Sequence, residues 1–157
     1  MIHFSEWLEA VKREPITSTK PLEIQSIDQE DDWELAQEVE NISRKVRIRF
    51  SREKNITLVA KVGDQVIGGV ASTIYHEEGM SVYDFDVVVD PQWQGYQMVG
   101  FKLIDSAISE ARNYEAHLIK VHVVNPRLAQ VLSNKYDFEG LPNNYSGKES
   151  VILYKYL

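Results

Sequence analysis

Two aspartates, Asp84 and Asp86, are the residues whose type and spacing point most directly to chemistry. Side chains that are two apart in a strand project from the same face, because successive residues alternate between faces. Beside a cleft, these carboxylates can accept the proton of an amine, directly or through water, or bind a cationic substrate. The alternative is a solvated strand face opposite Tyr83 and Phe85. In both cases the pair would give a neighbouring groove a negative character.

A loop that contains glycine follows the same stretch of sequence. The run Val87-Val88-Val89 leads to Pro91, and Gly95 and Gly100 come before the body of the next helix. Glycine lets the backbone adopt positive φ or approach a ligand closely, and the unpaired amides at a helix N-terminus can bind a pyrophosphate. The loop has no lysine or arginine before Lys102. It either holds a phosphate through backbone amides or serves only as a strand-to-helix turn.

The histidines predict no metal site, and a basic segment has several interpretations. His117 and His122 would face opposite sides of a strand and could not share a metal ion. His122 is either a base beside a cleft or a partly buried structural histidine. The segment 44–54 holds six basic residues against one acid. It is a solvated face that balances the acidic segment 28–40, a phosphate anchor or a nucleic-acid patch.

The hydrophobic pattern predicts an α/β (α+β) fold, with one mixed sheet flanked by helices. Strands are expected at 21–27, 80–90, 116–124 and 150–157, and on both sides of a Gly63-Asp64 turn within 56–76. Helices are expected at 5–13, within 28–46, at 98–113 and at 125–136. The valines that end the strand at 80–90 indicate burial on both faces. One apolar stripe of the helix at 98–113 comprises Leu103, Ile104, Ala107, Ile108 and Ala111.

Composition sets limits on compartment and partners. The chain has 157 residues, no cysteine and a formal net charge of −7. It has no apolar run near the roughly 20 residues that span a bilayer, and its first residues are acidic and amphipathic, unlike a secretory signal. We therefore expect a cytoplasmic protein without a membrane segment. The negative charge argues against nucleic-acid binding and favours a cationic partner such as an amine.

Several segments together resemble one family. The chain is similar to the GNAT superfamily of acyl-CoA-dependent N-acyltransferases in its order of predicted elements, in Val89-Asp90-Pro91 and the Gln-Gly loop, and in the segments 119–125 and 135–140. The resemblance covers residues 21–157 as a single domain, with residues 1–20 as an N-terminal helical extension. It implies a mostly antiparallel sheet in which a central parallel pair of strands splays apart.

The resemblance also implies acetyl transfer from acetyl-CoA to a primary amine. The acceptor would be a small-molecule or protein amine, and homodimers are common among such proteins. Pantetheine would bond to the backbone of the splayed strand and pyrophosphate to the loop amides, while a strand amide would stabilise the oxyanion. The implied cofactor-binding residues are Val87, Val88, Val89, Gln94, Gly95, Tyr96, Gln97, Met98, Val99, Gly100 and Asn125.

The pyrophosphate loop diverges from the family pattern. That pattern reads Arg/Gln-x-x-Gly-x-Gly/Ala, and no alignment of this chain matches it fully. Three registers compete, with the key positions at Gln94, Gln97 and Val99, at Gly95, Met98 and Gly100, or at Gln92, Gly95 and Gln97.

The proton donor diverges as well. The tyrosine that protonates the departing thiolate in the family would fall at Leu132 or Ser133. Tyr136, one turn later, either replaces it or packs beside Phe138. Tyr136, Asp84 and Asp86 are therefore the candidate catalytic residues. The alternative is a catalytically inactive GNAT-like domain with a binding or regulatory role, in which exposed Trp93 and Tyr96 contact a partner or a nucleotide.

Overall fold

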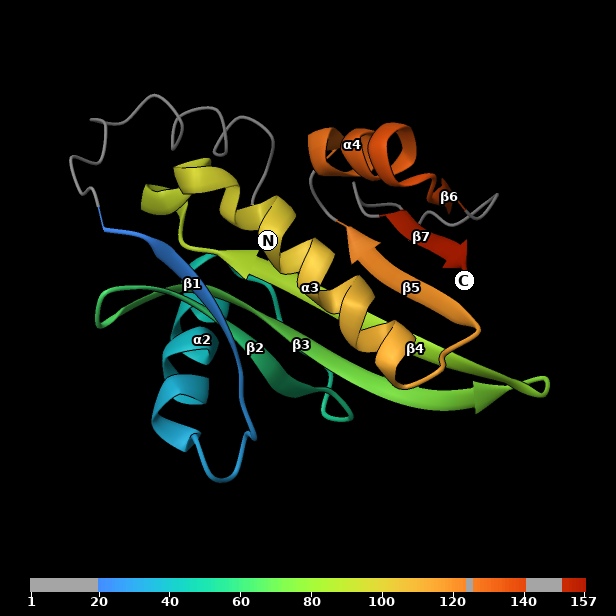
Figure 1. Cartoon of the computed structure of the whole chain (residues 1–157), viewed down its shortest axis with the longest axis horizontal. Helices are drawn as coiled ribbons and strands as arrows, with labels where there is room; N and C mark the ends of the chain where they lie inside the picture. The colour runs from blue at the N-terminus through green and yellow to red at the C-terminus, as the bar shows by residue number, and fades with distance from the viewer. Residues whose placement is uncertain (1–19, 124–125, 141–150) are drawn as a thin grey trace.

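The computed structural model describes residues 20–123, 126–140 and 151–157 (Figure 1). The predicted helix at 5–13 and the candidate residue Asn125 lie outside them. The strands are β1 (Leu22–Ser26), β2 (Asn55–Val62), β3 (Gln65–Glu77), β4 (Met80–Val89), β5 (Leu118–Val123), β6 (Glu139–Gly140) and β7 (Val151–Tyr156). The helices are α2 (Trp33–Lys45), α3 (Val99–Asn113) and α4 (Pro126–Tyr136), with 3₁₀ turns η1 (Pro91–Trp93) and η2 (Tyr96–Met98) before α3.

The strands form one mixed sheet. Within the described part of the chain it has seven strands, in the order β1-β2-β3-β4-β5-β7-β6. β4 and β5 are parallel, and every other neighbouring pair is antiparallel. This confirms the predicted mostly antiparallel sheet with a central parallel pair. The sequence pattern does not indicate β6, which has only two residues.

Helices cover both faces of the sheet. α2 buries Ala36, Val39 and Ile42 against one face. α3 lies across the other face (Figure 1) and buries its predicted stripe there, Leu103, Ile104, Ala107, Ile108 and Ala111. An apolar stripe with a helical period thus supplies one core layer on each side of the sheet. None of the described helices is long and apolar enough to cross a membrane.

α2 begins later than its acidic leading segment indicates. Asp28 Oδ1 accepts hydrogen bonds from the backbone N–H groups of Glu30 at 2.9 Å and Asp31 at 3.1 Å. The N–H of Asp28 in turn donates to Asp32 Oδ2 at 3.1 Å. Aspartate side chains that bond to nearby amides favour turns over helix. The helix therefore starts at Trp33, after a turn held by its own side chains.

β4 is the central strand, as its valine run predicts. Tyr83 and Phe85 are fully buried and join the core under α3. Val88 joins the cluster under α2 on the opposite face. Because side chains alternate along a strand, Asp84 and Asp86 share the face of Val88. The sheet therefore places both candidate carboxylates on the side opposite α3.

Candidate functional site

The parallel ladder between β4 and β5 ends part-way along both strands. Pairing runs from Val82 with Leu118 to Phe85 with Val121. Beyond that point β4 stays paired with β3 as far as Val89, and β5 stays paired with β7 to its last residue. The two strands therefore separate while both remain in the sheet, and their ends diverge in Figure 1.

The backbone of β4 faces this gap at Val87 and Val89. The N–H of Asp90 donates to the carbonyl of Ile67 on β3 at 2.8 Å. Backbone groups of successive residues point to opposite edges of a strand, so those of alternate residues point to the same edge. Those of Val88 therefore also point to β3, and those of Val87 and Val89 point toward β5, where the ladder has ended. Of the three candidate strand residues, these two present N–H and C=O groups to the gap.

The loop after β4 contains three residues with left-handed backbone. The φ angles are 82° at Gly95, 44° at Gln97 and 59° at Met98. Glycine adopts such values readily, whereas a residue with a side chain is less stable there by about 1–2 kcal/mol. α3 starts at Val99, directly after this turn and one residue later than predicted. The unpaired first amides of α3, including that of Gly100, therefore follow a strained segment.

This strain predicts the effect of a glycine at position 98. Met98 is exposed and makes no cap hydrogen bond through its side chain. We expect Met98→Gly to raise the free energy of unfolding by about 1 kcal/mol, since it removes the left-handed strain. Urea denaturation measures this. Lys102→Gly, which introduces a glycine at an exposed position with helical backbone in α3, is the matched control. It should lower that free energy by about 1 kcal/mol. A loss of stability in Met98→Gly would show that the turn is unstrained.

Side chains of the loop fasten it to the start of β1. The Tyr96 hydroxyl and Gln97 Nε2 both donate to the carbonyl of Lys20, at 2.5 and 3.1 Å. The N–H of Leu22 donates to Gln97 Oε1 at 3.0 Å. Trp93 is only 8% exposed and packs edge-on against Tyr96, with ring centroids 5.0 Å apart. The prediction of an exposed aromatic surface is therefore wrong for Trp93, and Tyr96 is half-buried.

The remaining loop positions differ in their surroundings. Gln94 Oε1 is buried and has no hydrogen-bond partner among the described residues. A Cβ added at Gly95 or Gly100 would have no neighbour within 4 Å. Lys45 Nζ lies 3.1 Å from Asp90 Oδ1 at the loop entrance. A lysine of α2 therefore lies beside the loop, paired with the aspartate at its entrance, and no local spacing rule could have found this contact.

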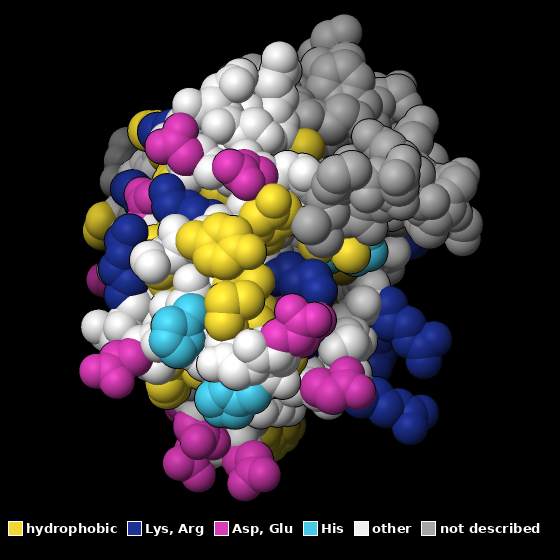
Figure 2. Space-filling model, turned by 90° about the vertical axis from the view of Figure 1, so that its right-hand side faces the viewer, with side chains coloured by type: hydrophobic (Ala, Val, Ile, Leu, Met, Phe, Trp, Pro, Cys, Tyr) yellow, Lys and Arg dark blue, Asp and Glu magenta, His cyan; other side chains and the backbone are white. Residues whose placement is uncertain are grey.

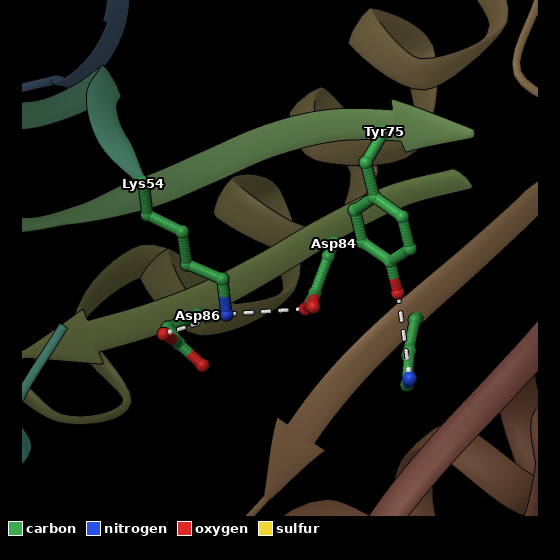
Figure 3. Close-up of polar contacts among 5 residues, drawn as sticks. Lys54, Tyr75, Asp84 and Asp86 are labelled. Atoms are coloured by element: carbon green, nitrogen blue, oxygen red, sulfur yellow. Dashed lines mark hydrogen bonds and ion pairs between the residues drawn. The ribbon is translucent and has the colours of Figure 1, made fainter. Parts of the chain in front are cut away.

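Asp84 and Asp86 form a buried cluster with Lys54 (Figure 3). Lys54 Nζ lies 3.1 Å from Asp84 Oδ1 and 3.0 Å from Asp86 Oδ2. The Lys54 side chain is only 7% exposed, and Asp86 is 8% exposed. The interpretation of the acids as a solvated strand face is therefore wrong for Asp86, and Asp84 is half-buried. The expected negative character is also largely cancelled, because a lysine from the basic segment 44–54 lies between them.

Burial and charge act against each other in this cluster. Burial raises the pKa of the Asp86 carboxyl above its ordinary value, and the nearby Lys54 ammonium only partly offsets this. Burial also disfavours the Lys54 ammonium, but Asp86 and Asp84 together hold its pKa above the ordinary value. Asp86 therefore takes up a proton more readily than a solvated aspartate, while Lys54 remains a cation.

Lys120 and His122 lie on the same side of the sheet as the cluster. Lys120 pairs in register with Asp84, and its Nζ donates to the Tyr75 hydroxyl at 3.4 Å (Figure 3). His122 is exposed, which corrects the interpretation of a partly buried structural histidine. Its charge is a minor influence that lowers the pKa of Asp86. In the described ranges, no three His, Asp or Glu side chains are arranged to hold a metal ion.

The end of the molecule that carries the C-terminus presents a mixed surface. Figure 2 shows hydrophobic side chains gathered in the middle of this side, bordered by histidine, acidic and basic residues. Tyr156, at the end of β7, is 61% exposed and packs edge-on against Tyr154 at 5.7 Å between ring centroids. An exposed aromatic ring, that of Tyr156, therefore lies at this end of the sheet, and the expected homodimer remains a prediction.

Tyr136 links α4 to α3. Its ring stacks on Phe101, with centroids 6.4 Å apart and planes 18° from parallel. Its hydroxyl is buried without a hydrogen bond among the described residues. Burial, and then the nearby Asp105 carboxylate, raise the pKa of Tyr136. The hydroxyl therefore stays protonated at neutral pH. Of the two positions where the family tyrosine would fall, Leu132 is buried and Ser133 is exposed.

A separate cleft of about 350 Å³ lies between α3 and the strands β1 and β2. Its lining residues are Ile24, Ser26, Leu58, Asp105, Ser106, Ser109, Glu110 and Asn113. Glu110 accepts a hydrogen bond from the Tyr83 hydroxyl at 3.0 Å. Tyr83 projects to the α3 side of the sheet, so the cleft lies on the opposite side from Asp84 and Asp86. The end of the β4–β5 ladder, rather than this cleft, locates the candidate site.

Solved structures share this fold. The structure of yncA from Salmonella typhimurium, solved with its cofactor acetyl-CoA, has a TM-score of 0.63 and 14% identity, covering 87% of this chain and 94% of that chain. PH1933 from Pyrococcus horikoshii OT3 has a TM-score of 0.65 and 19% identity, and the match covers 87% of this chain and 99% of that chain. Arabidopsis thaliana Naa50, solved with the bisubstrate analogue CoA-Ac-MVNAL, has a TM-score of 0.61 and 15% identity. The match covers 87% of this chain and 99% of that chain.

The sequence itself identifies the family. No curated protein sequence matches the chain. Residues 17–131 match the profile of the acetyltransferase (GNAT) family. The match spans well over half of the chain and includes the central strands, the loop and α3. The chain therefore belongs to the GNAT family of acetyltransferases.

Proposed function

We propose that this chain transfers an acetyl group from acetyl-CoA to a primary amine. The observation that carries the proposal is the gap between β4 and β5, where Val87 and Val89 present backbone N–H and C=O groups. Backbone groups in the middle of a sheet are otherwise paired. An extended ligand with its own amides satisfies them, and the pantetheine arm of coenzyme A has this chemistry. Acetyl-CoA held there would supply the acetyl group.

The loop residues 94–100 are the proposed phosphate site. The unpaired amides at the start of α3 favour an anion, and Gly95 and Gly100 leave open space beside the backbone. Lys45, held at the loop entrance by Asp90, provides a positive charge. The proposed site thus extends along residues 87–89 and 94–100, and Asn125, outside the described residues, stays a prediction.

Asp84, Asp86 and Tyr136 are the proposed proton-transfer residues. The two aspartates flank Phe85, which is the last β4 residue paired with β5. They would take the proton of the acceptor amine, and the raised pKa of Asp86 makes its carboxylate a stronger base than a solvated aspartate. Tyr136, which stays protonated at neutral pH, would return a proton to the leaving thiolate.

Calorimetric titration with acetyl-CoA, followed by a thiol-release assay on a panel of amines, tests this proposal. We expect saturable binding and release of coenzyme A with at least one amine. Absence of binding at millimolar acetyl-CoA would overturn the proposal. Binding without release on any amine would favour the alternative, a regulatory GNAT-fold protein. That alternative has one specific observation in its favour, since exposed Ser133 and buried Leu132 stand where the family has its tyrosine.

Gly100→Leu separates stability from cofactor binding. Gly100 lies in the first turn of α3 with ordinary helical backbone and open space around it, so a larger side chain fits. We expect the free energy of unfolding to rise by about 0.5–1 kcal/mol, while acetyl-CoA affinity falls at least tenfold because the leucine side chain occupies the phosphate approach. Thermal unfolding and calorimetry measure the two effects. Ser109→Leu, at an exposed position of the same helix, should leave affinity unchanged. Equal affinity in both variants would move the phosphate site elsewhere.

A further inference from the structure

An acid and a lysine face each other across β4 and β5 without pairing. Asp84 and Lys120 are register partners on the side of the sheet opposite α3. Asp84 Oδ1 instead binds Lys54 at 3.1 Å, and Lys120 Nζ instead donates to the Tyr75 hydroxyl at 3.4 Å (Figure 3). Oppositely charged cross-strand neighbours normally attract each other. Here Asp84 contacts Lys54 and Lys120 contacts Tyr75 instead, so each side chain can still bind a further group of opposite charge.

Lys120 has no counter-charge among the described residues. It is half-buried, and no acidic side chain in the described part of the chain lies within 4.0 Å of its Nζ. A neutral phenol hydroxyl does not compensate a cation that has been partly removed from water. Asp84 Oδ2 likewise accepts no hydrogen bond from a described residue, although Oδ1 does. The face therefore offers one site for an anion beside one site for an ammonium group.

Lys54 removes the attraction that a polycation would need. Its ammonium occupies the position between Asp84 and Asp86 where a second amine would otherwise bind. With Lys120 included, two lysines balance two aspartates on this face. A long cationic amine would meet Lys120 with repulsion after its first ammonium reached Asp84. A molecule with both charges meets attraction at both positions.

We infer that the amine acceptor also carries a carboxylate. Its amino group lies at Asp84, and its carboxylate lies at Lys120 and the Tyr75 hydroxyl, so amino acids are the substrate class. This inference rests on the proposed acetyl transfer, because it names the acceptor for that reaction. Lys120 is thereby the residue that determines acceptor specificity.

Matched pairs of acceptors test the inference. Each standard L-amino acid is compared with its own amide, which keeps the amine and side chain but lacks the carboxylate, and spermidine serves as the polycation. Coenzyme A release gives kcat/KM with acetyl-CoA present. Saturation-transfer NMR of the same compounds gives binding without any turnover. We expect at least one amino acid to exceed its amide and spermidine by tenfold or more.

Variants of Lys120 assign the preference to this side chain. In Lys120→Met the preference for the free acid over its amide should vanish through a rise in KM for the free acid. Lys120→Arg should keep at least part of it. Lys61→Met, which removes another half-buried lysine on β2, is the matched control and should keep all of it. Thermal unfolding of Lys120→Met should show no loss of stability, because the cation has no ion-pair partner to lose.

The outcomes separate the inference from the function on which it rests. If no amine releases coenzyme A, acetyl transfer is wrong, and the NMR comparison alone decides whether this face selects carboxylates. If amides or spermidine react or bind as well as the amino acids, the inference is wrong although acetyl transfer stands. Survival of the preference in Lys120→Met would also overturn it.

Discussion

Lys54→Met is expected to lower the free energy of unfolding by about 3 kcal/mol at pH 7, because it leaves the buried Asp86 and half-buried Asp84 carboxylates together without their cation. The Lys54 ammonium lies within 3.1 Å of both Asp84 and Asp86, and its side chain is almost fully buried. Methionine keeps most of the volume and removes only the charge. Urea denaturation of variant and wild type measures the difference.

The loss should depend on pH in a defined direction. The pKa of Asp86 already lies above its ordinary value of 3.8, and removal of Lys54 raises it further. An acid with a raised pKa destabilises the fold increasingly as pH rises through that value. The deficit of Lys54→Met should therefore be largest near neutral pH and shrink as pH falls toward 4. The stabilising contribution of Lys54, whose own pKa is raised above 10.5, should persist until that pKa is passed.

Two further variants control this experiment. Arg52→Met removes an exposed cation from the same segment and should change stability by less than about 0.5 kcal/mol. Adding Asp84→Asn and Asp86→Asn to Lys54→Met removes the uncompensated charges and should restore much of the loss. If Lys54→Met is as stable as Arg52→Met, the ion cluster contributes nothing and the cause proposed here is wrong.

Asp86→Asn is expected to lower kcat/KM for acetyl transfer by roughly 100-fold, the usual size of a general-base contribution. Asparagine keeps the shape of the side chain but cannot accept the amine proton. Lys54 keeps Asp84 as a partner, so stability should change little. Steady-state thiol release measures the rate, and calorimetry should show unchanged acetyl-CoA affinity.

The pH profile distinguishes a base from a structural residue. The wild-type rate should fall at low pH as Asp86 becomes protonated, with a midpoint above 3.8 because burial raises its pKa. Asp86→Asn should lose that limb of the profile, whereas Asp64→Asn, in the turn after β2, should keep both the limb and the rate. A full rate in Asp86→Asn would assign the proton acceptor to another group.

Local patterns predicted the scaffold of the site. The valines of β4, the stripe of α3 and the Gly63-Asp64 turn depend on residues close in sequence, and each element lies where its pattern indicates. The end of the β4–β5 ladder follows from the family resemblance rather than from any spacing. The start of α2 could not be predicted from its acidic leading segment, because hydrogen bonds from backbone N–H groups to the Asp28 side chain compete with the helix.

The charges of the site could not be predicted in the same way. Lys54 meets Asp86 from 32 positions away, and Lys45 meets Asp90 from 45 positions away. Such contacts depend on how α2 and the segment after it cross the sheet. One general signal was present, because two acids on a buried central strand require a compensating cation. The burial of Trp93 could not be predicted for the same reason, because it depends on a core cluster that is built from elements distant in sequence.

Because the ladder between β4 and β5 is short, the sheet consists of two halves joined along a narrow seam. In the described ranges, the β1–β4 half and the β5–β7 half share only four residue pairs, from Val82 with Leu118 to Phe85 with Val121. A molecule that lies in the gap, bonded to Val87 and Val89, would extend that seam as an additional strand. Substrate would then act as a structural member of the protein, and the cohesion of the two halves would rise and fall with each catalytic cycle.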